Sequence, residues 1–311
     1  MFTDIYLYTL QQQENKVMPK VNEDYPGKEL TDEQLKAQVI NQSFVDNKTE
    51  SNNKPTEKSA KYPTEIINLP SQGLLYPEDN PLSSGKIEMK YMTAKEEDIL
   101  TSQNLIKKGL VIDQLLRSLI VSPINYNDLL VGDKNAIMVA ARVLGYGGEY
   151  PVEITCPECG TKSKIEVNLT ELKDKPIDPA NYTKGENRFT TVLPASKRTI
   201  EWKLLTHSDE AKVAEMTKSI KKRSLVKTVD PQMSTRFKNM ILSVDNDEAQ
   251  ATINKFVDQE FLSRDTMFLR KEIEKLSPDI DMTFDFECPE CGHEVPNQQI
   301  PMNVQFFWPR V

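Results

Sequence analysis

After a short apolar opening at residues 1–10, the hydrophobic positions of this 311-residue chain are sparse over residues 11–62 and become periodic from residue 63 onward. Residues 11–62 are rich in Gln, Asn, Lys and Glu, and such a composition cannot bury enough apolar surface to offset the entropy lost on ordering. We therefore expect residues 1–62 to form a mostly disordered polar arm. One stretch of the arm places four apolar residues on a single helical face, which indicates a short helix that is either frayed or docked on a partner: Leu35, Val39, Ile40 and Phe44.

After the arm, the pattern predicts an extended segment, a strand and a first helix. Residues 66–77 combine a short apolar run with two prolines and a glycine, which is typical of an extended segment with tight turns. The alternation of apolar and polar residues over 86–92 predicts a half-buried strand. Thr93 and Glu96 have the spacing of a capping box, and the helix that they open is expected to continue to Gly109.

Two more helices follow in the same part of the chain. Residues 110–121 carry a wide apolar stripe that must be buried, and Pro123 ends this segment. Asp133 begins a helix whose apolar side continues to Gly145. The region 63–170 therefore contains a strand and three helices, and it leads into strands around the first cysteines.

The four cysteines of the chain occur in two identical pentapeptides, Cys156-Pro-Glu-Cys159-Gly160 and Cys288-Pro-Glu-Cys291-Gly292. Two thiolates on one tight turn can bind the same metal ion, and a structural zinc takes four ligands in a tetrahedron. The glycine after each pair permits the positive φ that such a turn requires. Strand-like runs flank the turns at 149–155, 162–169 and 281–287. The sequence thus predicts a zinc ribbon cut into two halves, with one structural zinc per chain held by Cys156, Cys159, Cys288 and Cys291.

Other arrangements of these cysteines are less favoured. Two disulfides would suit a small secreted scaffold, whereas this chain is long and its apolar opening stretch lacks the features of a signal peptide. A redox CxxC pair normally opens a helix, whereas here Pro-Glu lies inside each pair and Gly follows it. His293 is a second candidate for one coordination position, although a lone histidine in a loop is more commonly solvated.

A separate block lies between the two halves of the ribbon. Residues 188–193 and 198–205 flank a Pro-Ala-Ser-Lys turn and predict a β-hairpin. Four helical patterns with short joints follow: 208–223, 231–244, 247–261 and 263–276. We interpret residues 171–277 as an inserted subdomain, and residues 63–170 together with 278–311 as the main domain. The predicted fold class is α+β, with a helical core, a split zinc ribbon and an inserted subdomain of a hairpin and helices.

Charge and hydropathy narrow the class of protein. The chain carries 39 basic and 47 acidic side chains, a net charge of −8, so its overall field does not favour nucleic acid or an anionic membrane. It contains no apolar run of about 18 residues, so we expect no transmembrane helix. These features predict a soluble protein of a reducing cytosol.

The residues that catalytic sites require are scarce. The sequence has only two histidines, His207 and His293, and no glycine-rich phosphate-binding motif. The carboxylates of residues 96–98 fall in the first turn of a helix and the basic residues of 218–223 near a helix end, where the helix dipole favours each charge. The sequence therefore indicates neither an enzyme nor a small-molecule substrate.

Several motifs occur along the chain in a fixed order. They are Ser71-Gln-Gly-Leu-Leu-Tyr-Pro77, Met89–Leu100, Gly132-Asp133, Gly145-Tyr-Gly147, Cys156-Pro-Glu-Cys159 and Phe306-Phe-Trp-Pro309. In this order they resemble the T4-type bacteriophage baseplate protein family, whose members include the hub and hub-assembly proteins of contractile tails. The resemblance covers roughly residues 64–311.

The resemblance implies a late phage protein that acts in virion morphogenesis through other baseplate and hub proteins, without catalysis. It further implies a place in the host cytoplasm during assembly and in the tail baseplate of the virion. Two questions stay open at this point. A zinc ribbon is also typical of nucleic-acid-binding or transcription-associated proteins, which bind with a steep salt dependence. The aromatic residues Phe306, Phe307 and Trp308 either complete the core, which we favour, or anchor in a partner.

Overall fold

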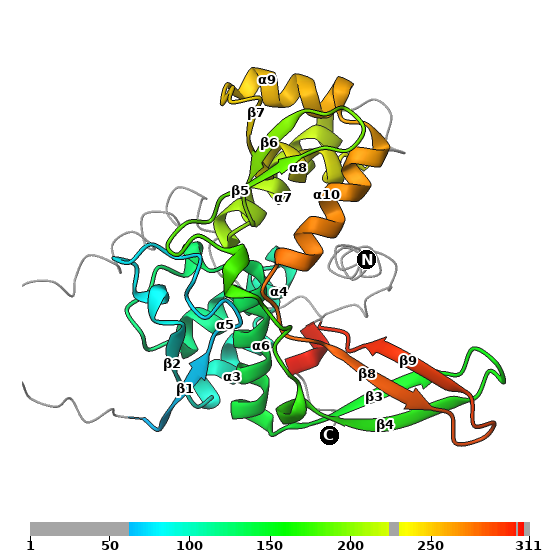
Figure 1. Ribbon diagram of the computed structural model, residues 1–311. Coiled ribbons are helices and arrows are strands. Elements are labelled where there is room, and N and C mark those ends of the chain that lie inside the picture. The colour runs from blue at the N-terminus through cyan, green and yellow to red at the C-terminus, as the bar shows by residue number, and fades with distance from the viewer. Residues whose placement is uncertain (1–61, 224–229, 303, 308–311) are drawn as a thin grey trace, which may run out of the picture. The chain divides into compact units, whose positions relative to one another are not determined.

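Helices and four small antiparallel sheets make up the part of the chain that the structure describes, in agreement with the mixed fold class expected from the sequence (Figure 1). The structure is a computed structural model and describes residues 62–223, 230–302 and 304–307. The chain divides into two units, residues 1–61 and 62–311, and only the second contains described residues. Apart from Tyr62, the predicted polar arm with its short helix therefore lies outside the described residues.

The first sheet pairs β1 (Thr64–Asn68) with β2 (Lys86–Lys90), so the strand predicted over 86–92 is confirmed. Gly73 lies in the connection between the two strands with a φ of +78°, and a Cβ atom there would come within 2.2 Å of the Ser83 carbonyl oxygen. Only glycine fits such a close approach of two backbones at positive φ. The tight turns expected between residues 66 and 77 thus depend on this residue.

The α-helices between β2 and the first cysteine turn are α3 (Ala94–Thr101), α4 (Gln103–Lys108), α5 (Val111–Leu119) and α6 (Val131–Tyr146). The capping box of Thr93 and Glu96 is confirmed, but the prediction of one helix up to Gly109 is wrong. Ser102 has an extended backbone and separates α3 from α4. On one continuous helix the apolar pairs 99–100 and 105–106 would point about 120° apart, at 100° per residue. The break lets all four side chains reach the core.

Two hairpins carry the cysteine turns. The first consists of β3 (Glu149–Thr155) and β4 (Lys162–Asn168), and the second of β8 (Thr283–Glu287) and β9 (Glu294–Gln299). The first three strands are confirmed. β9 was not predicted, because Pro296 and the polar residues after it hide the alternation of a strand.

The block between the hairpins forms a three-stranded sheet with helices. Its elements are β5 (Phe189–Val192), β6 (Thr199–Trp202), α7 (His207–Arg223), α8 (Gln232–Met240), β7 (Ile241–Val244), α9 (Gln250–Lys255) with a π-helical turn at Phe256–Glu260, and α10 (Ser263–Leu276). The predicted hairpin is confirmed. The prediction of a helix over 231–244 is wrong at its end, since residues 241–244 form a third strand on β6.

Packing explains why residues 241–244 form a strand, and the turn that follows explains why the next helix begins later than predicted. Ile241 and Val244 are buried beside β6, where β-branched side chains pack well on a pleated surface. Asp245 and Asn246 then adopt positive φ values of 50° and 66°, which only a turn accommodates. The helix predicted from residue 247 therefore begins at Gln250.

The aromatic residues near the end of the chain lie in the core. Phe306 and Phe307 have no exposed surface, and the ring of Phe306 lies 5.0 Å from that of Tyr150 at the start of β3. The interpretation of these two phenylalanines as core residues is confirmed, whereas Trp308 lies outside the described residues. None of the described helices is both long and apolar enough to cross a membrane.

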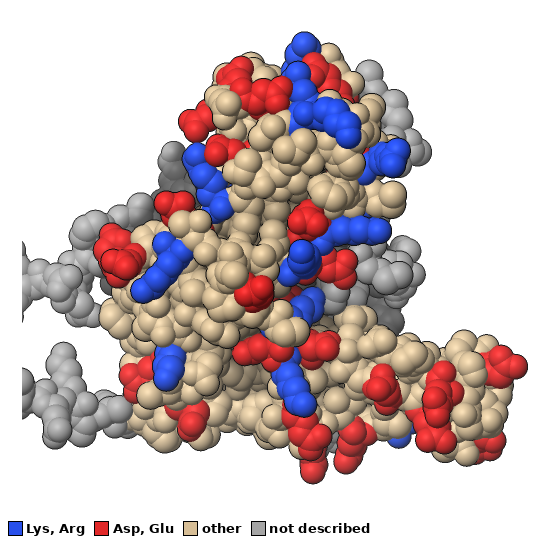
Figure 2. Space-filling model, viewed as in Figure 1, with Lys and Arg blue, Asp and Glu red and all other residues tan. Residues whose placement is uncertain are grey.

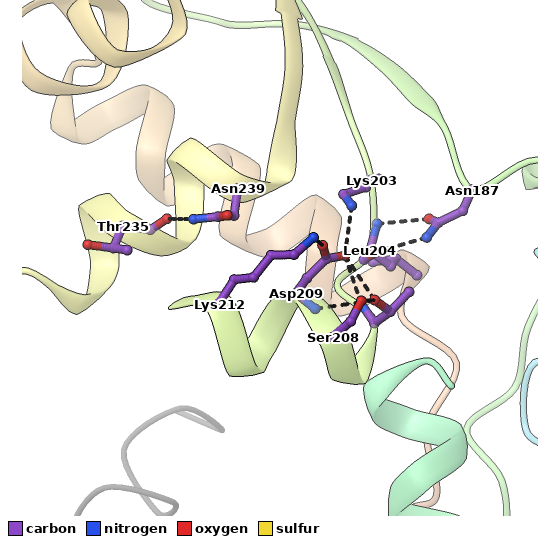
Figure 3. Close-up of polar contacts among 9 residues, drawn as sticks. Asn187, Lys203, Leu204, Ser208, Asp209, Lys212, Thr235 and Asn239 are labelled. Carbon is purple, nitrogen blue, oxygen red and sulfur yellow. Dashed lines mark hydrogen bonds and ion pairs between the residues drawn. The ribbon is translucent and has the colours of Figure 1, made fainter. Parts of the chain in front are cut away.

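Side-chain hydrogen bonds fix the connection from β6 to α7 (Figure 3). The Asn187 amide donates to the Leu204 carbonyl at 2.8 Å and accepts from the Leu204 N–H at 2.9 Å, as a neighbouring strand would. The Asp209 carboxylate accepts from Lys203 Nζ at 2.7 Å and from the Thr206 N–H at 3.2 Å. Asp209 thereby satisfies one of the free N–H groups at the start of α7.

The first residue of α7 also contacts α5, α6 and the segment that joins these two helices. The His207 N–H donates to the Leu129 carbonyl at 2.7 Å. Its Nδ1 lies 3.3 Å from Lys134 Nζ, and its Nε2 lies 3.6 Å from an oxygen of Asp113. Because an ammonium group only donates, Nδ1 must be the acceptor, and the proton of the neutral ring resides on Nε2.

This geometry predicts that protonation of His207 destabilises the fold. Burial, Lys134 and Arg117 hold the pKa of His207 below its usual value, although Asp113 opposes them. A depressed folded-state pKa gives stability that is present above the unfolded value of about 6.5 and is lost as the pH falls through the folded value. Urea unfolding at a series of pH values should therefore show wild-type protein losing stability below about pH 6.5 relative to His207→Asn, which retains an acceptor for Lys134.

The second histidine provides the matched control. His293→Asn should keep the pH dependence of the wild type, because that side chain lies outside the cluster around Asp113. Parallel curves for wild type and His207→Asn would contradict the assignment of His207 as the acid-sensitive contact.

Candidate metal centre

The two Cys-Pro-Glu-Cys-Gly turns have the same backbone structure. The Cys156 N–H donates to the Thr161 carbonyl and the Gly160 N–H to the Cys156 carbonyl, at 2.9 and 3.0 Å. In the second turn, Cys288 donates to His293 and Gly292 to Cys288, both at 2.9 Å. Both glycines have a positive φ, 73° and 68°, with open space where a Cβ would lie, so conformation rather than room requires glycine there.

The four thiols meet between the two hairpins. Cys156 Sγ lies 3.7 Å from Cys291 Sγ, and Cys159 Sγ lies 3.6 Å from Cys288 Sγ, although these partners are 135 and 129 residues apart in sequence. All four sulfurs lie within 4.8 Å of one another. Cys156 and Cys288 are buried, and Cys159 and Cys291 are exposed.

These distances fit a tetrahedral metal site. With metal–sulfur bonds of about 2.3 Å, neighbouring sulfurs of a tetrahedron lie about 3.8 Å apart. The observed separations are close to that value, whereas a disulfide requires about 2.05 Å. The four thiols are free, and each close pair joins one hairpin to the other. The arrangement is therefore compatible with one metal ion bound between the hairpins.

His293 takes part in the second turn through its backbone. It occupies the position in the second turn that Thr161 occupies in the first, and its backbone carbonyl accepts the hydrogen bond from Cys288. The cluster of metal-ligating groups found in the described residues contains the four cysteines without His293. The site residues predicted from the sequence are thus the ones that the fold brings together.

The electrostatic environment favours one thiolate in particular. Hydrogen bonds from the side chain and the backbone of Thr161 lower the pKa of the Cys159 thiol to about 6. A thiol must lose its proton to bind a metal, so these bonds support the ligand form of Cys159 at neutral pH.

A small apolar cluster lies beneath the thiols. Phe286 is 2% exposed and groups with the buried Cys156 and Cys288. Side chains from all four strands pack around it: Ile154, Ile165, Phe284 and Val295. A cluster of this size cannot hold two hairpins together alone, which is why small domains commonly add a metal.

The chain segments on either side of the block between the two hairpins pair with each other. Residue 174 forms a bridge with residue 280, the Lys175 N–H donates to the Asp279 carbonyl at 2.8 Å, and the Asp281 N–H donates to the Lys173 carbonyl at 2.7 Å. The segment that leaves the first hairpin and the segment that enters the second are thereby held side by side. This pairing brings the two distant cysteine turns together.

Helix α6 positions both hairpins. Gly132, in its first turn, touches the returning strand so closely that a Cβ would lie 1.8 Å from the Pro278 carbonyl oxygen. Asn135 Nδ2 donates to Asp279 at 3.1 Å. At the other end of the helix, the buried Arg142 donates to the carbonyls of Gly147 and Glu149, which fixes the entry into β3.

Two of the motifs from which the family resemblance was drawn contact each other. The Asp133 carboxylate, which has no exposed surface, accepts from the Ser71 N–H at 3.0 Å, the Ser71 hydroxyl at 2.7 Å and the Tyr76 hydroxyl at 2.6 Å. The Tyr76 oxygen in turn accepts from the Leu130 N–H. Gly132-Asp133 thus ties α6 to the extended segment that contains Ser71 and Tyr76. The sequence did not mark Asp133 as a buried acceptor, because an acidic residue at a helix start suggests an exposed cap.

Charge is distributed unevenly over the chain. The hairpin segments 149–171 and 281–299 contain ten acidic and two basic residues, so they account for the whole net charge of −8. Figure 2 shows acidic side chains along the hairpins on the face in view. A four-thiolate site with a divalent ion would add two further negative charges. The hairpins therefore present a negative surface.

A family model described as T4 bacteriophage base plate protein matches residues 75–308. The match covers most of the chain, and the chain belongs to this family of phage baseplate proteins. The resemblance expected from the sequence motifs is thereby confirmed. Comparisons with curated proteins and with solved structures gave no significant match.

The contact between α6 and the returning strand predicts an unusual response to a small substitution. Gly→Ala inside a helix normally stabilises by up to about 1 kcal/mol. Gly132→Ala should instead destabilise by about 1–3 kcal/mol, because the new methyl group collides with backbone at Pro278. Urea unfolding measures the difference.

Gly145→Ala in the same helix is the matched control. The close approaches of its methyl group are to the flexible end of Met92, which can move, so the variant should be neutral or more stable. Unchanged or increased stability of Gly132→Ala would show that residues 278–281 do not depend on this close approach.

Proposed function

We propose that this protein is a structural or assembly component of a contractile-tail baseplate, at or near the hub, and that one structural Zn²⁺ joins its two hairpins into a split zinc ribbon. The observation that carries the proposal is the convergence of four thiols from two distant turns, in a chain of the baseplate family. Cys156, Cys159, Cys288 and Cys291 would be the ligands.

The donor set favours zinc and a structural role. Four thiolates exclude the hard cations Mg²⁺ and Ca²⁺, which take oxygen ligands, and they suit zinc in a closed tetrahedron. A site closed by four protein ligands has no open position for water or substrate, so the metal would supply folding free energy rather than catalysis. The proposed activity is therefore protein–protein interaction without an enzymatic step.

The organisation of the chain supports the same proposal. We propose that residues 63–170 and 278–311 form the main domain, that residues 171–277 form an inserted subdomain, and that residues 1–62 form a polar arm. Other baseplate and hub proteins would be the partners. The protein would act in the host cytoplasm during assembly and in the tail baseplate of the virion.

A nucleic-acid-binding ribbon is the second candidate, and the charge of the hairpins argues against it. A protein that contacts phosphates places lysine and arginine on the binding surface. Here the two hairpin segments carry ten acidic residues and two basic ones. Such a surface repels a phosphate backbone and suits a protein partner.

The test is complementation of an infection in which this protein has been removed. Without it, electron microscopy of lysates should show filled heads with no attached contractile tails. Supplying the wild-type chain should restore complete particles, and supplying Cys288→Ser should not, because three thiolates cannot hold the two hairpins as four do.

Glu290→Gln is the control within the same turn, because Glu290 lies between the two cysteines and is exposed. It should restore complete particles. Complete particles in the absence of the protein would overturn the baseplate role. Complete particles with Cys288→Ser would overturn the structural metal while leaving the baseplate role standing.

A further inference from the structure

The strand β1 has one hydrogen-bonding edge that no other described segment covers. Tyr91 donates to the Pro63 carbonyl and Leu69 to the Gly85 carbonyl, so the odd-numbered residues of β1 bond with β2. In an antiparallel pair the alternate residues direct their N–H and C=O groups away from the partner. Thr64, Ile66 and Asn68 therefore direct theirs to the outer edge.

The opposite edge of this small sheet is already occupied. The Glu88 carbonyl accepts from the Val121 N–H at 2.9 Å, the Glu88 N–H donates to the Ser122 hydroxyl at 2.8 Å, and Met89 forms a bridge with Ile120. Any strand that extends this sheet must therefore add to β1.

β1 has few of the features that normally protect an outer strand. Natural edge strands carry lysine, proline, a bulge or an inward-pointing charge. β1 pairs with β2 in a regular register without a bulge and contains no lysine or proline, and its one charged residue, Glu65, lies on the opposite face from Ile66. Ile66 is 65% exposed, the highest value among the exposed large hydrophobic residues described.

We propose that β1 is a self-association surface, at which a second copy of this chain adds its own β1 in antiparallel orientation with the two-fold axis at Ile66. This register pairs Ile66 with Ile66 of the second copy and Thr64 with Asn68. All the outward backbone groups of both strands then bond, and the two sheets become one of four strands. The proposal does not depend on the metal or on the baseplate role.

The side chains are complementary in this register. Ile66 meets its own copy and buries the most exposed apolar side chain, while Thr64 and Asn68 form a polar pair on the same face. Glu65 lies opposite Ile67 of the second copy, so no like charges face each other. A two-fold contact requires such self-complementarity, and two-fold dimers are the commonest oligomers.

The other outer strand with an exposed apolar residue provides a control. Val192 on β5 is 59% exposed. Because Leu193 donates to the Arg198 carbonyl, the four-residue β5 directs the groups of only Thr190 and Val192 outward. This edge is shorter than that of β1.

Sedimentation of the full-length chain over a wide range of concentrations tests the proposal. Wild type should show a reversible monomer–dimer equilibrium, since a five-residue strand pair buries less than a standard interface of about 1,600 Å². Ile66→Lys should remain monomeric at every concentration, and Val192→Lys should dimerise like wild type. A monomeric wild type, or a dimer that survives Ile66→Lys, would overturn the proposal.

A disulfide test checks the register independently of folding or solubility. Hydrogen-bonded antiparallel pairs have Cα atoms about 5.5 Å apart, within the range of about 4.4–6.8 Å that a disulfide spans. Under oxidised glutathione, Ile66→Cys should form more of a dimer that a reductant separates than wild type does, and Val192→Cys should not. Equal cross-linking of the two variants would reject the two-fold axis at Ile66.

Discussion

The pairing of residues 173–175 with residues 279–281 is the constraint on which the rest of the structure depends. Two cysteine turns about 130 residues apart can share a site only if the chain that separates them starts and ends at the same place. The paired segments provide that place. One of them packs so closely against Gly132 of α6 that no side chain would fit at that position. A block of a three-stranded sheet and its helices can then lie between the hairpins without moving them apart. In a long flexible connection, loop-closure entropy would oppose the meeting of the turns, whereas here the block between the hairpins is itself folded.

Three buried carboxylates also hold separate segments of the chain together elsewhere in the fold. Asp133 binds the extended segment at Ser71 and Tyr76, Glu96 joins β2 to α3 and α5, and Asp265 of α10 accepts from the N–H groups of Ala195 and Ser196 in the β5–β6 turn. Each has no exposed surface, so its charge must be balanced by hydrogen bonds. Although burial opposes it, bonds from Lys90, Ser118 and Thr93 lower the pKa of Glu96 to about 2, whereas burial raises that of Asp133 to about 6. These carboxylates connect the extended segment, β2 and the β5–β6 turn to the helices that carry the acidic side chains.

The sequence predicted the parts of the structure that local chemistry determines. The repeated Cys-Pro-Glu-Cys-Gly turns, the capping box at Thr93 and the strands with regular alternation were confirmed, because each depends on residues close together in the chain. The predictions that were wrong or missing share one cause, because tertiary contacts decide the structure at those positions. Residues 241–244 leave a helical pattern to pair with β6, the helix from Thr93 breaks so that two apolar pairs reach one core, and β9 forms opposite β8 despite Pro296. The role of Asp133 also required the fold, since its partners lie about 60 residues earlier in the chain.

Native mass spectrometry of the purified full-length chain, combined with metal analysis, tests the central claim most directly. The account predicts one zinc per chain, held by thiolates from both hairpins, and loss of that zinc in Cys288→Ser with retention in Glu290→Gln. Two zinc ions per chain would mean that each turn binds its own metal, and a chain without metal would mean that the hairpins meet for another reason. Either result would contradict a single site that joins the two halves of the ribbon.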